Sequence, residues 1–373
     1  MRLLAATVIA GVAITNVASG FLGAEASAKA ASRTVPQRAE VRLKRDTTAV
    51  TGITAAALVA GGYDLILNAD FERLQSELPA ICGPLSGGTG PAPRVACLGL
   101  ESLSLWWQIQ LDPESRVLDP AFLAKVNAAI DEADRMTEAE PNRAEAWFYL
   151  GAAYGARAQW RVLREERLAA ARDGKRIKRA LERALALDPA MHDAEFGIGM
   201  YRYYADVAPA VLKFLRWLML LPGGDRVDGL RQLERAAADG QLVRGEAQYQ
   251  IHVLYLWYEN KWREALAIVQ QLQSRYPRNP HFHQIEAEIL DLYFHDPTAS
   301  LRASEQLLTR ARDGAVERPV LAETVARLNM ARQLRALKQT DAAIAQLDAI
   351  IAARPAMPAG ALARAQRMRR EIR

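Results

Sequence analysis

The sequence has little of the material that common enzyme sites require. Its 373 residues include only two cysteines and five histidines. No serine, cysteine or threonine stands in a G-x-S-x-G or related setting, and G-x-x-x-x-G-K-[ST] and H-E-x-x-H are both absent. The glycine-rich stretch GPLSGGTGPAP does not lie between a strand and a helix, so it does not have the context of a phosphate-binding loop. These absences favour a protein that is not an enzyme and needs no cofactor.

A metal site is not predicted either. His281 and His283 lie close to Glu286 and Glu288 in the sequence. On a helix, however, residues two positions apart do not share a face, so the two imidazoles would diverge. We therefore interpret these histidines as hydrogen-bonded residues of a helix.

Sustained alternation of apolar and polar residues is missing after residue 50, which excludes a β-rich fold. Alanine, leucine, glutamate and arginine instead form segments that have the length of helices and are separated by Pro, Gly, Asn or Asp. The net charge is +5. We interpret the basic residues as spread along the chain, with one local excess of arginine in the final stretch ALARAQRMRREIR. This distribution does not suggest a nucleic-acid-binding face.

The first thirty residues form the longest apolar run, from Leu3 to Leu22. The motif Ala26-Ser27-Ala28 fits a signal-peptide cleavage site, so we predict a signal peptide over 1–30 and a flexible linker over 31–47. The alternative is an uncleaved membrane anchor, because the run nearly spans a bilayer. No cysteine follows the run, which argues against lipid modification. The expected location is the periplasm; a membrane-anchored form facing the periplasm and a secreted form are the alternatives.

Cysteine usage agrees with export. Cys82 and Cys97 flank a loop rich in glycine and proline. An even number of cysteines in an exported chain predicts a structural disulfide, and a redox-active pair would require a closer spacing such as C-x-x-C.

A helical repeat accounts for the rest of the chain. The stretch AEAWFYLGAAYG places Trp147, Leu150, Gly151 and Tyr154 at the spacing W-x2-L-G-x2-Y, which resembles the first helix of a tetratricopeptide repeat. Four segments keep the offsets of the second helix, in which small residues allow close packing and proline ends the helix. They contain Ala129, Ala133, Met136 and Pro141; Ile177, Leu181, Ala184 and Pro189; Ala265, Val269, Leu272 and Pro277; and Ala343, Leu347, Ile350 and Pro355.

The predicted fold is an all-α, tetratricopeptide-like solenoid over 48–373, with about seven helical hairpins. The hairpins are expected near 48–81, 98–141, 142–189, 190–240, 244–277, 280–314 and 319–355, and a capping helix near 358–373. Extra residues between Trp147 and Ile177 predict that both helices of that hairpin are long.

The apolar stretch Val211–Leu221 is too short to span a bilayer. It contains Lys213 and Arg216, which we expect to be its most solvated residues. We interpret it as an inserted core helix, with Asp225 as the N-cap of the next helix. The surrounding segment, with Gly224-Asp225-Arg226 before Gly229-Leu230, resembles the inclusion-body-clearance and tetratricopeptide repeat protein 39 family. That resemblance implies an adaptor or scaffold.

A concave groove is the expected binding site. Aligning the repeats places Tyr203, Tyr204, Trp257, Tyr258, Arg332 and Arg335 on the first helices that line it. We therefore expect an exported scaffold or adaptor for peptides or proteins of the cell envelope, with no nucleic acid involved. The alternatives are an enzyme or enzyme subunit built on a helical toroid, and a scaffold associated peripherally with the membrane or held by an uncleaved N-terminal anchor.

Overall fold

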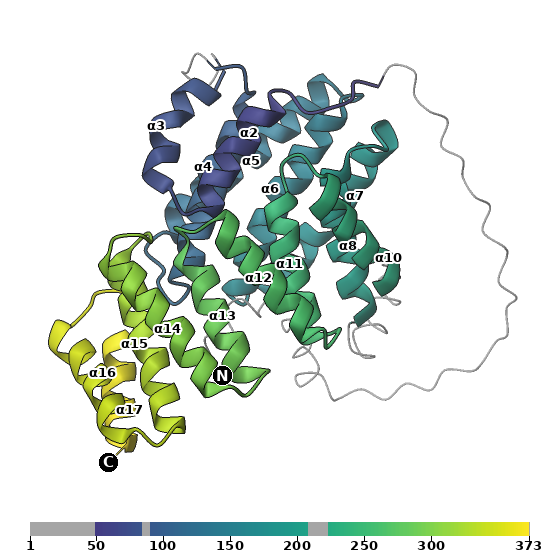
Figure 1. Ribbon diagram of the computed structural model, residues 1–373. Helices are drawn as coiled ribbons and strands as arrows, with labels where there is room; N and C mark the ends of the chain where they lie inside the picture. Colours follow the sequence, from purple (N-terminus) through teal and green to yellow (C-terminus); the bar gives the residue numbers. More distant parts are fainter. Residues whose placement is uncertain (1–48, 84–89, 208–222, 373) are drawn as a thin grey trace, which may run out of the picture.

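A computed structural model describes residues 49–83, 90–207 and 223–372 of the chain. Within these ranges the protein consists of fifteen α-helices joined by short turns, so the prediction of an all-α solenoid is confirmed (Figure 1). The helices are α2 (Ala56–Leu67), α3 (Phe71–Ile81), α4 (Arg94–Leu111), α5 (Asp119–Ala139), α6 (Ala144–Leu163), α7 (Arg167–Leu187), α8 (His192–Val207), α10 (Arg226–Asp239), α11 (Arg244–Trp257), α12 (Trp262–Arg275), α13 (Pro280–Leu292), α14 (Pro297–Arg312), α15 (Pro319–Ala336), α16 (Thr340–Ala353) and α17 (Ala361–Ile372).

Consecutive helices pair as antiparallel neighbours and follow the predicted hairpins closely. The largest difference is in the first hairpin, whose first helix begins at Ala56 rather than near 48; the second hairpin begins at Arg94 rather than near 98. Helices α6 and α7 have 20 and 21 residues, as the extra chain between Trp147 and Ile177 predicts. The small residues at the second-helix offsets are buried: Ala129, Ala184 and Ala265 are at most 1% exposed. Their burial lets the two helices of each hairpin approach closely.

Several helices begin where the sequence supplies a cap. The carboxylate of Asp225 accepts a hydrogen bond from the backbone N–H of Asp228 at 2.9 Å, so the predicted N-cap of α10 is confirmed. Asn279 and Asp296 cap α13 and α14 in the same way, and proline follows each of them at the first helical position.

The parts of the chain outside the described residues include several predicted features. These are the signal peptide over 1–30, the linker over 31–47, and the inserted helix Val211–Leu221 with Lys213 and Arg216. Among the helices that are described, none combines the length and apolarity needed to cross a bilayer.

The disulfide between Cys82 and Cys97 is present, which confirms that prediction. It joins the C-cap of α3 to the first turn of α4, and both cysteines are buried. Backbone hydrogen bonds between Ile81, Gly83 and Ala92 close the same loop.

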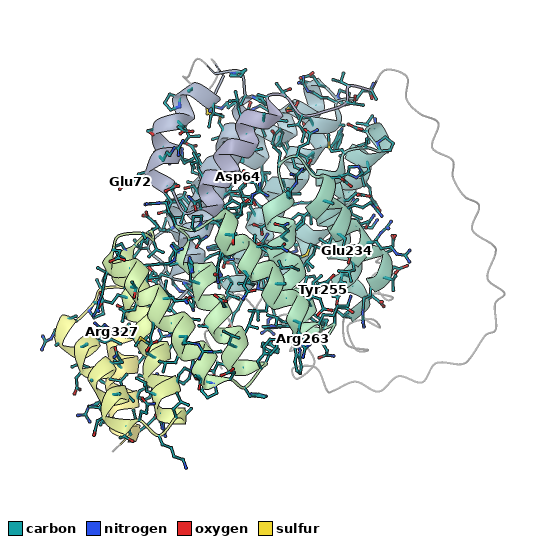
Figure 2. All side chains as sticks on the ribbon, in the orientation of Figure 1. Asp64, Glu72, Glu234, Tyr255, Arg263 and Arg327 are labelled. Atoms are coloured by element: carbon teal, nitrogen blue, oxygen red, sulfur yellow. A yellow bond between two sulfur atoms is a disulfide. The ribbon has the colours of Figure 1, made fainter. Side chains whose placement is uncertain are left out.

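The solenoid curves until its first hairpin meets its fifth and sixth. The phenol of Tyr276 donates to Asp64 of α2 at 2.6 Å, and Arg275 pairs with the same carboxylate. Figure 2 labels Asp64 on α2. On α13, the Asn279 amide donates to the backbone oxygen of Leu67 at 2.7 Å. Neighbouring first helices α2, α4, α6 and α8 contact one another in turn, and α11 contacts α2, so the inner helices form a ring.

The C-terminal hairpins also contact α4 and the turn that follows it. Arg318, just before α15, donates to Gln108 of α4 at 2.7 Å. The carboxylate of Asp112, at the end of α4, accepts the backbone N–H of Ala359, and Glu114 pairs with Arg364. The N-terminal part of the solenoid is thus tied both to the fifth and sixth hairpins and to the C-terminal hairpins.

Candidate functional site

The inner helices enclose a large apolar cavity of about 570 Å³, which is within the usual size of a small-molecule site. Its walls come from α2, α4, α6, α7 and α8, and the start of α11 closes it. Leu100, Phe148 and Leu181 are typical of the lining, which is largely aliphatic or aromatic. Binding of an apolar ligand in such a cavity is favourable, because it removes apolar surface from water.

Three of these helices contain a glycine at a position where a larger side chain would not clash with any neighbouring residue. A Cβ atom added to Gly99 of α4, Gly155 of α6 or Gly174 of α7 would meet nothing within 4 Å. Glycine inside a helix is about 1 kcal/mol less favourable than alanine, so these residues weaken their helices without relieving any contact. Their effect is to widen the cavity.

Other glycines of the same cavity serve packing. A Cβ at Gly151 would lie 2.4 Å from the side chain of Leu181, and one at Gly197 would lie 2.3 Å from it. The two glycines let α6 and α8 approach α7 on either side of one leucine.

The closed end of the cavity carries a polar cluster. Glu246 of α11 is 3% exposed; it accepts a hydrogen bond from Tyr63 at 3.1 Å and another from the amide of Gln250 at 3.2 Å. Burial raises the pKa of the Glu246 carboxyl, and the hydrogen bonds only partly oppose this. The nearby Asp193 accepts the backbone N–H groups of Gln241, Leu242 and Val243. Both carboxylates therefore hold the structure together at this end.

Three polar atoms of the lining residues have no hydrogen-bond partner in the described parts of the chain. They are the indole nitrogen of Trp106 and the phenol oxygens of Tyr149 and Tyr204. Burial raises the pKa of both phenols well above the usual value, so they are donors at all ordinary pH. Unsatisfied buried donors are costly in a folded protein.

The open side of the cavity is basic. Helix α7 contains seven basic and two acidic residues, so this one helix has as large a net charge as the entire chain, +5. Arg167 and Lys175 line the cavity, and the side chain of neither has a hydrogen bond or ion pair within the described residues. Leu168, which also lines the cavity, is 75% exposed.

The acidic residue at the centre of α7 is fully buried and is used within the fold. Asp173 is 0% exposed and pairs with Arg157, Arg161 and Arg176. These ion pairs fix α7 against α6 and leave Arg167 and Lys175 as the unpaired cations of the cavity wall.

Of the six residues predicted for a groove, only Tyr204 lines the cavity. Tyr203 is fully buried and donates to Glu259, and it makes edge-to-face contacts with Tyr204 and Tyr258. Trp257 packs half-buried against the main core. These aromatics join α8 to α11 and lie behind the wall of the cavity. Burial is the physical reason, since aromatic side chains satisfy most of their surface in a core.

The two predicted arginines lie elsewhere, on α15. Arg332 pairs with Asp291 and donates to Asn329, and Arg335 is exposed near Glu371. They belong to the C-terminal hairpins, which contribute no residue to the cavity lining.

The histidines also have structural partners. His281 bonds to the phenol of Tyr249 at 3.1 Å, and His283 bonds to the backbone oxygen of Pro277 at 3.1 Å. Burial lowers the pKa of His281 to about 4 and that of His252 to about 3. In the described ranges no group of three metal-ligating side chains comes together.

The cavity residues were therefore missed by sequence reasoning that looked for aromatic density. Two signals in the sequence point to them. The charge excess of α7 is visible over 167–183, and the glycines at 99, 155 and 174 interrupt helical segments that otherwise have good helix formers.

The chain was compared with protein-family models and with curated proteins. No family model matches it, and no curated protein matches it. The resemblance to tetratricopeptide repeats and to the inclusion-body-clearance family thus remains a prediction from the residues.

Proposed function

We propose that this protein is an exported binding protein of the cell envelope whose ligand occupies the cavity inside the ring of α2, α4, α6, α8 and α11. The observation that carries the proposal is the cavity itself, about 570 Å³ of apolar space widened by glycines on three walls. The interior of a stable fold is normally filled by side chains. An open space of this size, lined by glycines that reduce helix stability, therefore favours a role in binding.

The charged groups of the site favour binding over catalysis. Glu246 and Asp193 are engaged by neighbouring hydrogen-bond donors. Glu246 accepts from the phenol of Tyr63, whose pKa burial raises well above its usual value, and Asp193 accepts from backbone N–H groups. The disulfide agrees with export to an oxidising compartment, where such bonds persist.

A blocking substitution tests the proposal. Gly155→Phe places a large ring in the cavity at a position where a Cβ meets nothing, so the helix tolerates the change. The measurement is the fluorescence of an uncharged solvent-sensitive dye titrated into the purified full chain. We expect wild type to bind about one dye per chain, and Gly155→Phe to bind at least about 10-fold more weakly, which corresponds to 1.4 kcal/mol.

Gly61→Phe is the matched control. Gly61 is also a helical glycine whose Cβ would meet nothing, but it lies on the exposed side of α2 and does not line the cavity. This variant should bind the dye like wild type. Equal dye binding by wild type and a folded Gly155→Phe variant, judged by circular dichroism, would show that the cavity is not the site.

A further inference from the structure

The cavity is amphipathic: Arg167 and Lys175 stand at its open side, and the carboxylates at its closed end are already engaged by hydrogen bonds. Along α7 the lining residues extend from Arg167 to Leu181, about 21 Å at 1.5 Å per residue. Arg167, Leu168 and Lys175 stand on the accessible part of this line, whereas Leu181 is buried between Gly151 and Gly197. A ligand that follows the wall formed by α7 meets positive charge at the open side and the apolar side chains of Ile177 and Leu181 further in.

The chemistry of the cavity argues against an extended peptide. An extended peptide would bring backbone N–H and C=O groups that each need a partner. The walls offer few: the carboxylates at the closed end are already engaged, and most of the lining is aliphatic or aromatic.

A flexible hydrocarbon chain does not need such hydrogen-bond partners. It is narrow, it carries no backbone polar groups, and each buried methylene contributes to affinity. The glycines at 99, 155 and 174 provide the open wall along which such a chain lies.

We propose that the cavity binds one anionic amphiphile, with a single acyl chain against the glycines of α4, α6 and α7 and a carboxylate or phosphate head group at Arg167 and Lys175. This inference rests on the proposed function and names the class of its ligand.

The first test is a chain-length series. Decanoate, dodecanoate and tetradecanoate, each below its micelle concentration, are titrated into the full chain by calorimetry. Affinity should rise about 4-fold per methylene, or about 15-fold for each step of two carbons. A lysophosphatidic acid with the same chain distinguishes a lipid from a free fatty acid: tighter binding of the lysophosphatidic acid assigns the ligand as a lysophospholipid, and tighter binding of the fatty acid assigns it as a free acid. An affinity that does not depend on chain length would overturn the proposal.

The second test concerns the head group. Arg167→Gln with Lys175→Gln should weaken tetradecanoate binding about 5-fold and leave the neutral alcohol tetradecanol unchanged, since solvated ion pairs each contribute modestly. The matched control is Arg172→Gln with Arg179→Gln, which removes the same charge from the exposed face of the same helix. An equal loss in both double variants would show general attraction to a basic helix and would contradict a head-group site.

The outcomes separate this inference from the proposed function. If an apolar helical peptide displaces the dye from wild type but acyl amphiphiles do not, the cavity binds a protein segment, and only the ligand class is wrong. If amphiphiles bind only after Phe214 and Trp217 are replaced by serine, the apolar stretch of the chain itself occupies the cavity, and the inference is also overturned. If neither amphiphiles nor dye bind, both proposals fail.

Discussion

At the scale of single residues, glycine has two opposite roles in one cavity. Gly151 allows a helix to approach Leu181, whereas Gly155, four residues along the same helix, has only open space above it. Sequence alone does not separate them, because both stand at similar positions in the stretch LGAAYGARA. The difference comes from the neighbouring helices, and it is measurable.

Alanine at these two glycines should change stability in opposite directions. Gly155→Ala should raise the free energy of unfolding by about 0.5–1 kcal/mol, because alanine has the higher helix propensity. Gly151→Ala should lower it by about 1–3 kcal/mol, because the new Cβ overlaps Leu181. Urea unfolding followed by circular dichroism measures both changes. A destabilised Gly155→Ala variant would mean that the space above Gly155 is not open.

The buried histidines predict a dependence of stability on pH. His252 and His281 have their pKa values lowered by burial to about 3 and about 4, so the folded state keeps them neutral while the unfolded chain binds protons near pH 6.5. Their contribution to stability is complete above pH 6.5 and is lost as the pH falls toward 4. Each histidine should contribute a slope of about 1.4 kcal/mol per pH unit within this window.

His281→Gln tests this slope. The free energy of unfolding measured between pH 6 and pH 5 should change less steeply in this variant than in wild type, by about 1 kcal/mol per pH unit. His295→Gln, at an exposed histidine, is the control and should keep the slope of wild type. The same slope in all three proteins would mean that His281 binds its proton in the folded state.

At the scale of elements, α7 is held by one carboxylate. Asp173 is enclosed by three guanidinium groups, two from α6 and one from its own helix. The pairing orients the face of α7 that carries Arg167 and Lys175 toward the cavity. Removing one partner of a buried ion pair leaves the others without compensation, which costs far more than the loss of an exposed pair.

Asp173→Asn should therefore lower the free energy of unfolding by about 3 kcal/mol and weaken ligand binding at the cavity. Glu182→Gln removes the exposed carboxylate of the same helix, which pairs with Lys178, and should change stability by less than about 0.5 kcal/mol. Thermal unfolding and dye titration of both variants measure these effects. If the two variants have similar stability, Asp173 does not hold α7 in place.

Much of this element-level structure is predictable from the sequence. Helix hairpins depend on local signals, such as the small residues of the repeat offsets, Asp225 at the start of α10 and the prolines that end helices, and these signals placed the helices well. The cavity is different. It depends on how far the solenoid curves before α2 meets α11, and this follows from contacts more than 180 residues apart, such as Tyr63 with Glu246. The alignment of the repeats predicts an open groove, and the aromatic residues that it places there pack instead between α8 and α11, behind the wall of the cavity.

At the scale of the whole molecule, the ring is closed by a few residues of the first two hairpins and of the fifth and sixth. Trp107 of α4 packs against Tyr249 and Phe282, and Asn279 connects α13 to the end of α2. Further round the ring, Tyr255 of α11 donates to Glu234 of α10, and Figure 2 labels both. Since Val59 and Tyr63 of α2 line the cavity, closure of the ring and formation of the site are one event.

Asn279 makes this coupling testable because its side chain has two separable functions. Its oxygen caps α13 by accepting the N–H of His281 at 3.0 Å, and its nitrogen donates to the backbone oxygen of Leu67 at 2.7 Å. The residue is 1% exposed, so water does not replace either bond. Asn279→Asp retains the cap but loses the donor to α2, and it should lower the free energy of unfolding by about 1–3 kcal/mol.

The control is Asp296→Ala, which removes the N-cap of the neighbouring helix α14 and leaves the contact with α2 intact. It should cost about 1 kcal/mol without changing affinity at the cavity. Asn279→Asp should instead increase amide hydrogen exchange along α2 and weaken dye binding, because the wall formed by Val59 and Tyr63 is released. If Asn279→Asp binds the dye as well as Asp296→Ala does, the cavity forms without closure of the ring, and the coupling between the two is wrong.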